Sequence, residues 1–146
     1  MSRHSIIPAV YLILKNVQGQ YCLTRRFNTG YMDGYYSLPA GHLDGGESLK
    51  EAMIREVKEE VNILILPEDM ELVHVSNNLI SDPERIDFFF LCHKWEGEAT
   101  INEPDKCDDI QWVTLDNLPE NIVTIVKTAL TESHIGNNYS QVRGEV

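Results

Sequence analysis

A loop containing several glycines leads directly into an amphipathic helix between residues 40 and 63, and this segment constrains the fold most strongly. Ser48 and Glu51 have the spacing of a capping box, which predicts that the helix begins at Ser48. At about 100° per residue, the apolar side chains of the helix form one stripe that must pack against another layer. The stripe consists of Leu49, Met53, Ile54, Val57 and Val61. We expect the helix to end near Val61.

Segments rich in apolar and β-branched residues alternate with polar loops on both sides of this helix. Strands are predicted at residues 6–14, 21–26, 70–77, 85–95 and 110–115, and a second helix is predicted after Pro119. A short turn separates the first two strands, so we expect them to form a hairpin. This order predicts an α/β or α+β domain, residues 1–135, in which helices flank a mixed sheet. Residues 136–146 are polar, and we expect a loosely ordered tail there.

The chain is acidic, with 23 acidic and 12 basic residues among 146 and a formal net charge of −11. This charge disfavours unaided binding to a nucleic-acid polymer, because basic side chains must displace the counterions of the phosphate backbone. A small phosphate-bearing molecule is compatible with it if divalent metals intervene. There is no apolar run of membrane-spanning length, and the three cysteines show no metal-ligand spacing. We therefore expect a cytoplasmic protein without a membrane partner.

Three glutamates, Glu56, Glu59 and Glu60, crowd into little more than one helical turn beside the apolar stripe. Like charges three or four residues apart repel each other on a helix, and partial burial raises their cost unless a cation neutralises them. The ordinary alternative is a solvated charged face paired with nearby lysines and arginines. Because the glutamates border the buried side instead, we interpret them as ligands for a hard divalent ion such as Mg²⁺.

The same segment matches a family signature. Gly41 is followed after five residues by Glu47, and after seven more by the run REVKEEVNI from Arg55 to Ile63. This pattern resembles the Nudix box, G-x5-E-x7-R-E-U-x-E-E-x-G-U, in which U is an apolar residue. The box departs from the family at Asn62, which stands where Nudix proteins have a glycine. Asparagine is the next most tolerant residue of the left-handed conformation that ends such a helix.

The likeness extends beyond the box, because SLPAGHLDGGES and DDIQWVTLDNLPENI resemble the family's flanking segments and together bring most of residues 5–130 into it. The chain thus resembles MutT-like Nudix hydrolases. That resemblance implies an α/β/α sandwich with a mixed β-sheet. It also implies hydrolysis of the pyrophosphate bond in a nucleoside diphosphate linked to a group X, with Mg²⁺ or Mn²⁺ as cofactor. Nudix proteins are often homodimers, although nothing in this sequence indicates an interface.

Roles for the box residues follow from the resemblance. Glu56, Glu59 and Glu60 would bind the metal, and either Glu59 or Glu60 would help to position or deprotonate the attacking water. Arg55 and Glu47 would form a supporting ion pair that orients these ligands.

Contacts to the substrate are expected from outside the helix. Arg25 and Arg26 end a strand, and alternation along it predicts that at most one faces the site. Gly41 lies in the loop that we expect to fold tightly against the helix start. Glu103, Asp108 and Asp109 compete for the role of an additional base or metal ligand. Further candidates, each with packing or surface exposure as the alternative, are Tyr36, Asn28, Tyr31 and Arg85.

Two classes of function are compatible with these residues. The first is an enzyme, and the second is a Nudix-like module that binds a nucleotide or metal without turnover. The enzyme is favoured because every box carboxylate is retained. We expect a (deoxy)nucleoside triphosphate as substrate, cleaved to a monophosphate and pyrophosphate, because the chain is small and lacks recognised elements for larger substrates. Nucleotide sugars, dinucleoside polyphosphates and coenzyme-type substrates stay open.

Overall fold

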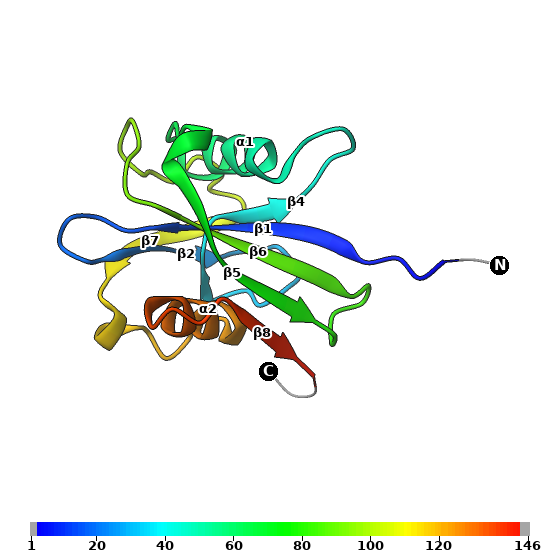
Figure 1. Cartoon of the computed structure of the whole chain (residues 1–146). Coiled ribbons are helices and arrows are strands. Elements are labelled where there is room, and N and C mark those ends of the chain that lie inside the picture. The colour runs from blue at the N-terminus through cyan, green and yellow to red at the C-terminus, as the bar shows by residue number, and fades with distance from the viewer. Residues whose placement is uncertain (1–2, 144–146) are drawn as a thin grey trace.

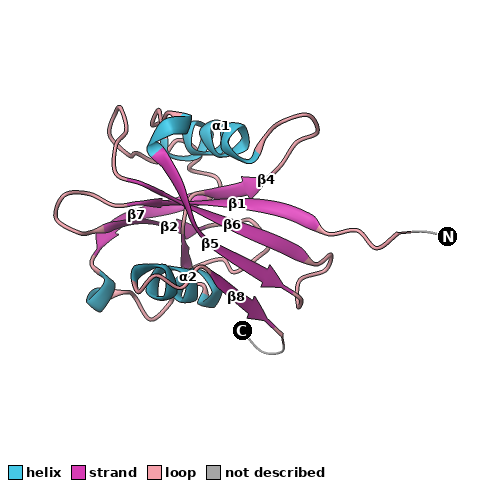
Figure 2. Cartoon of the chain, in the orientation of Figure 1, coloured by secondary structure: helices cyan, strands magenta, loops and turns pink. Residues whose placement is uncertain are grey.

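In the computed structural model, which describes residues 3–143, two helices lie on opposite sides of a layer of strands (Figure 1). Helix α1 (Leu49–Val61) covers one side, and helix α2 (Thr124–His134) covers the other. Figure 2 shows the strands running between the two helices. The expected α/β/α sandwich is confirmed.

The strands form two sheets. The larger sheet has the order β4-β1-β6-β5-β8, and its strands are β1 (Ile7–Leu14), β4 (Ala40–His42), β5 (Met70–Asn78), β6 (Arg85–Cys92) and β8 (Tyr139–Val142). The smaller sheet has the order β3-β2-β7, and its strands are β2 (Tyr21–Arg26), β3 (Tyr36–Ser37) and β7 (Cys107–Val113). The larger sheet is mixed, because β1 pairs parallel with β6 and antiparallel with β4. Two 3-10 helices, Pro67–Asp69 and Leu115–Asn117, complete the elements of the described part of the chain.

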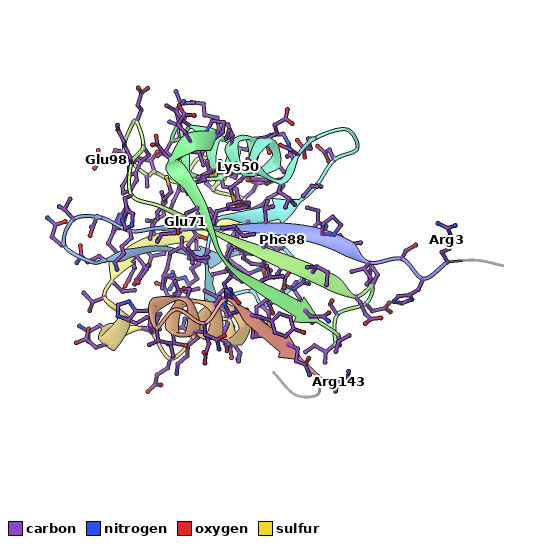
Figure 3. All side chains as sticks on the ribbon, in the orientation of Figure 1. Arg3, Lys50, Glu71, Phe88, Glu98 and Arg143 are labelled. Carbon is purple, nitrogen blue, oxygen red and sulfur yellow. The ribbon has the colours of Figure 1, made fainter. Side chains whose placement is uncertain are left out.

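Strand β1 is buried on both faces, which explains its nearly continuous apolar sequence. Val10, Leu12 and Leu14 pack in the core cluster that contains the inner face of α1. Tyr11 and Ile13 point the other way, into the cluster that contains the inner face of α2. Side chains fill the space between the strands and each helix (Figure 3). A central strand fixed on both faces is a rigid support for the residues at its edges.

Both ends of α1 form as the sequence predicts. The Ser48 hydroxyl accepts from the Glu51 amide at 3.1 Å, and the Glu51 carboxylate accepts from the Ser48 amide at 3.0 Å. Asn62 ends the helix in the left-handed conformation, with φ 62° and ψ 39°. The helix is thereby fixed in position relative to the loop that precedes it.

The predicted hairpin between the first two strands is wrong. Strand β1 is bonded to β4 on one side and to β6 on the other, so neither edge is available to β2. Strand β2 pairs instead with β3 and β7. Within residues 3–143, the two segments meet only beside the turn, through the bridge between Lys15 and Tyr21 and the backbone hydrogen bond from Asn16 to Gln20. The second helix also starts later than expected, at Thr124, because Val123 first donates a backbone hydrogen bond to Tyr36.

The expectation of a loosely ordered tail is corrected for most of its length, although residues 144–146 lie outside the described residues. Strand β8 pairs parallel with β5 at the edge of the larger sheet. Buried His74 of β5 holds the segment, since its ring nitrogens lie 2.8 Å from the Asn137 carbonyl oxygen and 2.9 Å from the Ser140 hydroxyl. Within residues 3–143, no helix has the length and apolar character needed to cross a membrane.

Candidate active site

The site is built where α1 crosses strand β4, at the closest approach between Gly41 and Glu56. A β-carbon added at Gly41 would stand 2.6 Å from Cγ of Glu56 and closer still to its carboxyl group. Such contacts are far inside van der Waals distance, so any side chain at residue 41 would displace the end of the Glu56 side chain from this position. Gly41 thus positions Glu56 through its lack of a side chain.

Arg55 organises the carboxylates around it. Its guanidinium donates to Glu47 at 2.6 and 3.1 Å, to Glu56 at 2.7 Å and to the His42 carbonyl oxygen at 3.2 Å. The ion pair with Glu47 that the family resemblance implies is therefore present. Hydrogen bonding from Arg55 lowers the pKa of Glu47. Burial raises the pKa of Glu56, and Arg55 only partly offsets that effect.

The other two glutamates of the cluster have different surroundings. Both carboxylate oxygens of Glu60 lie 3.2 Å from the backbone N–H of Ala40, which donates to them. Burial raises the pKa of Glu60 well above its ordinary value, against the opposing effect of that amide. The Glu59 side chain is 51% exposed and lies 3.6 Å from the Arg55 guanidinium. Burial therefore disfavours the ionised form of Glu56 and Glu60, whereas the carboxyl group of Glu59 is open to solvent.

All three glutamates line a cavity of about 510 Å³ between α1 and the smaller sheet, and Glu103 joins them there. Basic side chains from Arg25, Arg26 and Lys106 line the same cavity. Its other lining residues are Thr24, Asn28, Thr29, Leu38, Ala40 and Cys107. The cavity thus brings an acidic group of side chains and a basic group together around one space.

Both arginines that end β2 line this cavity, so the prediction that at most one would face it is wrong. The pairing of β2 with β7 shifts register between Arg25 and Arg26, and this irregularity breaks the alternation of side chains. Arg25 donates to Asp108 at 2.7 Å. Arg26 donates to the Tyr31 carbonyl oxygen at 2.6 Å and lies 5.2 Å from the centre of the Tyr31 ring.

Of the three acidic candidates in the loop and strand that follow residue 102, only Glu103 lines the cavity. Asp108 is paired with Arg25, and Asp109 accepts a hydrogen bond from the Tyr36 hydroxyl. That bond lowers the pKa of Asp109. Tyr36 is buried and does not line the cavity, so the structure does not support the expected substrate contact. Lys106 was missed, although it lies three residues after Glu103 and 3.9 Å from its carboxylate.

A divalent cation fits the chemistry of this donor set. Within residues 3–143, no three acidic, histidine or cysteine side chains are already gathered as a metal cluster. Glu56 and Glu60 are instead bonded to Arg55 and to the Ala40 amide. Yet four carboxylates share one cavity, and all offer the oxygen ligands that hard cations prefer. Burial raises the pKa of Glu56 and Glu60, so a nearby cation would favour their ionised forms.

Comparison with known proteins decides the family. The model of the NUDIX domain matches residues 6–131. This chain belongs to the Nudix family. Among solved structures, a MutT Nudix hydrolase from Burkholderia pseudomallei is 27% identical, with a TM-score of 0.73 over 85% of this chain and 96% of that one. A MutT protein from Methanosarcina mazei Go1 is 24% identical with a TM-score of 0.79, over 94% and 99% of the two chains, and supports the fold.

Curated relatives of this Nudix protein carry several names. The NAD-capped RNA hydrolase NudC of Pseudomonas aeruginosa is 33% identical over 89 residues, which are 61% of this chain and 30% of that protein. The 8-oxo-dGTP diphosphatase of Escherichia coli K12 is 30% identical over 86 residues, 59% of this chain and 65% of that one. The match therefore spans less than a third of the NudC length and just under two thirds of the diphosphatase.

A second cavity of about 350 Å³ adjoins the first in this Nudix fold. The two cavities share Arg26, Ala40 and Glu56 as lining residues. The second extends over β1 and β6, where Tyr11 and Arg85 line it. Gly41 lines this second cavity and not the first. The candidate site thus consists of two neighbouring cavities, the first lined by acidic and basic side chains and the second partly by aromatic ones.

Proposed function

We propose that this Nudix protein is a pyrophosphohydrolase that uses Mg²⁺, or Mn²⁺ in its place, to cleave the pyrophosphate bond of a nucleoside diphosphate-X compound. The substrate that we propose is a (deoxy)nucleoside triphosphate, which would give a nucleoside monophosphate and pyrophosphate. One observation carries the proposal: four carboxylates and three basic side chains line the same cavity. Carboxylates bind metal ions, and basic side chains bind the phosphates of a substrate.

Each residue group has a distinct role in this proposal. Glu56, Glu59 and Glu60 hold the metal, and Glu59 or Glu60 positions the attacking water or accepts its proton. The bound cation would neutralise phosphate charge and acidify water. Arg25, Arg26 and Lys106 bind phosphate oxygens as charge shifts toward the leaving group. Arg55 and Glu47 keep the carboxylates oriented, as groups behind metal ligands commonly do.

The names of the relatives support a pyrophosphate-bond substrate and suggest two kinds of it. One relative is named an 8-oxo-dGTP diphosphatase, and another is named an NAD-capped RNA hydrolase. We favour the small nucleotide because the net charge of −11 opposes binding of an RNA chain. A capped RNA end is the second candidate, and a module that binds nucleotide without turnover is the third.

Hydrolysis of a broad panel tests the proposal. The panel contains ribo- and deoxynucleoside triphosphates, nucleotide sugars, dinucleoside polyphosphates, NAD and a short NAD-capped RNA, each assayed with Mg²⁺ and with chelator. We expect one substrate class to be turned over, with loss in chelator and a drop of about 100-fold or more in Glu59→Gln or Glu60→Gln. Glu71→Gln, at an exposed position of β5, serves as the matched control and should retain activity.

The other outcomes are equally informative. Preference for the capped RNA over every free nucleotide would replace the small-molecule substrate with an RNA end. Metal-dependent nucleotide binding without any turnover would contradict the enzyme and support the binding module.

A further inference from the structure

An ion pair that the proposed chemistry does not use lies at the edge of the second cavity. Arg85 of β6 donates through Nε to Oδ1 of Asp87 at 3.0 Å, and the two side chains are 13% and 0% exposed. Buried ion pairs contribute little net stability, because removing two charges from water offsets most of their attraction. The fold alone therefore gives no reason for a charged pair inside an otherwise apolar strand.

Arg85 lines the second cavity and keeps hydrogen-bonding capacity that Asp87 does not use. Its Nη2 lies 3.5 Å from both the Tyr11 hydroxyl and the second Asp87 oxygen, at the limit of a hydrogen bond. Its Nη1 has no hydrogen-bond partner within residues 3–143, yet Ser76 Oγ is the sole buried side-chain atom left unpaired there. Nη1 is therefore accessible to solvent, on a side chain that lines the second cavity. Asp87 therefore holds the Nε side of the guanidinium, while Nη1 is free and Nη2 makes only two contacts at 3.5 Å.

The charges around the cavity favour a neutral partner for those donors. Asp87 already balances Arg85, and Asp44 and Glu56 line the cavity together with Arg26. A phosphate or carboxylate would therefore meet as much negative as positive charge. A neutral group with two adjacent acceptors would meet no such repulsion. The lining also suits a flat ring, since it combines the Tyr31 side chain with small residues, namely Ala9, Ala40 and Gly41.

We propose that Arg85 is a specificity-determining residue that binds the O6 and N7 acceptors of a 6-oxopurine base, such as guanine or hypoxanthine, in the second cavity. Arginine pairs with these two atoms in a bidentate manner, whereas adenine presents an amino donor at the same edge. This inference rests on the proposed function, in which the first cavity holds the phosphates. The shared residues Arg26, Ala40 and Glu56 mark the junction where base and phosphates meet.

Cytosine also carries two neighbouring acceptors, but their position relative to the sugar differs from that in a 6-oxopurine. In cytosine, O2 is bonded next to the nitrogen that bears the sugar, so this acceptor points back toward the phosphates. Arg85 lines the second cavity and is not among the residues that this cavity shares with the first. Its donors therefore face the part of a base that is distant from the sugar. That position matches O6 of a purine.

A comparison of bases tests Arg85. We expect the wild type to show a kcat/KM for GTP and ITP about 5- to 150-fold above that for ATP and CTP, the range that one bidentate contact supplies. Because Arg85→Met alone would leave Asp87 buried and unpaired, the informative variant is the double substitution Arg85→Met with Asp87→Leu. In it, the preference for GTP over ATP should fall below about threefold. Arg143→Met, at an exposed arginine, is the control and should keep the wild-type ratio.

Turnover without a base preference, or with a preference for ATP or CTP, would overturn the role of Arg85 and leave the proposed function standing. Absence of turnover for every nucleotide would instead contradict the proposed function. Titration calorimetry with GMP and AMP in Mg²⁺ then decides the role of Arg85 independently. Tighter GMP binding that the double variant loses would support the inference, and equal or absent binding of the two nucleotides would overturn it.

Discussion

At the scale of single residues, the site depends on one position that has no side chain. Gly41 has no positive φ in this structure, so backbone freedom does not explain it. What explains it is the Glu56 side chain, which occupies the volume that a β-carbon would fill. The glycine of the box is thus a packing requirement imposed by a carboxylate, and it links β4 to the acidic face of α1.

Gly41→Ala should therefore disturb both stability and activity. The new methyl group must push the end of the Glu56 side chain aside and break its hydrogen bond with Arg55, and the loss of such a bond costs about 1 kcal/mol of unfolding free energy. We expect kcat/KM to fall at the same time, because Glu56 leaves its place beside Arg55. Gly45→Ala is the matched control, since a β-carbon there meets nothing within 4 Å. Urea denaturation and steady-state kinetics measure the two effects, and equal behaviour of the two variants would contradict this account.

At the scale of elements, α1 shows what the sequence can predict and what it cannot. Its start, end and buried stripe follow from local rules, so Ser48, Glu51 and Val61 were placed correctly. The pairing of β2 could not be predicted in this way, because it depends on β1 already being bonded to β4 and β6. Strand β8 was missed for the same reason, since its polar residues become a strand only through contacts with β5 and His74.

The residues of the candidate site also fall into two groups, those that a local motif predicts and those that only the folded chain brings together. The carboxylates of α1 and their partner Arg55 were predicted because the box fixes them within one local segment. Arg26, Lys106 and Arg85 come from three separate elements or loops, and only the folded chain shows which of them reach a cavity. Tyr36 was misjudged because aromatic residues pack in cores as readily as they bind ligands. The sequence did carry a signal for Asp87, because an acidic residue stands inside the apolar run RIDFFF.

The left-handed residue that ends α1 leads to a prediction about the free energy of unfolding. Asn62 has φ 62°, a conformation that costs a residue with a branched side chain about 1–2 kcal/mol. Asn62→Val should lower the free energy of unfolding by that amount. Asn62→Gly, which restores the family residue, should change it by no more than about 0.5 kcal/mol, because the lost hydrogen bond with Lys58 is exposed. Urea denaturation compares the two, and equal destabilisation by valine and glycine would contradict the argument.

At the scale of the whole molecule, the carboxylates couple metal binding to stability. A ligand that binds only the folded state raises the unfolding free energy, by about 2.7 kcal/mol at one hundred times its dissociation constant. We expect Mg²⁺ to raise the melting temperature of the wild type and chelator to reverse the shift. Glu56→Gln with Glu60→Gln should abolish the shift, while Glu71→Gln should retain it. Calorimetric melting without substrate measures this, and an unchanged shift in the double variant would place the metal elsewhere.

The parallel pairings of the larger sheet have a consequence for the order in which the chain can fold. Ile7 of β1 lies opposite Arg85, and Val75 of β5 lies opposite Tyr139, so each of these partners is separated by more than sixty residues. Contacts of this kind close slowly, because the intervening chain must first lose its freedom. During synthesis on the ribosome, β5 keeps an unpaired edge until residues 139–142 have emerged. A nascent chain halted before that point exposes the edge to chaperones and to other chains alike.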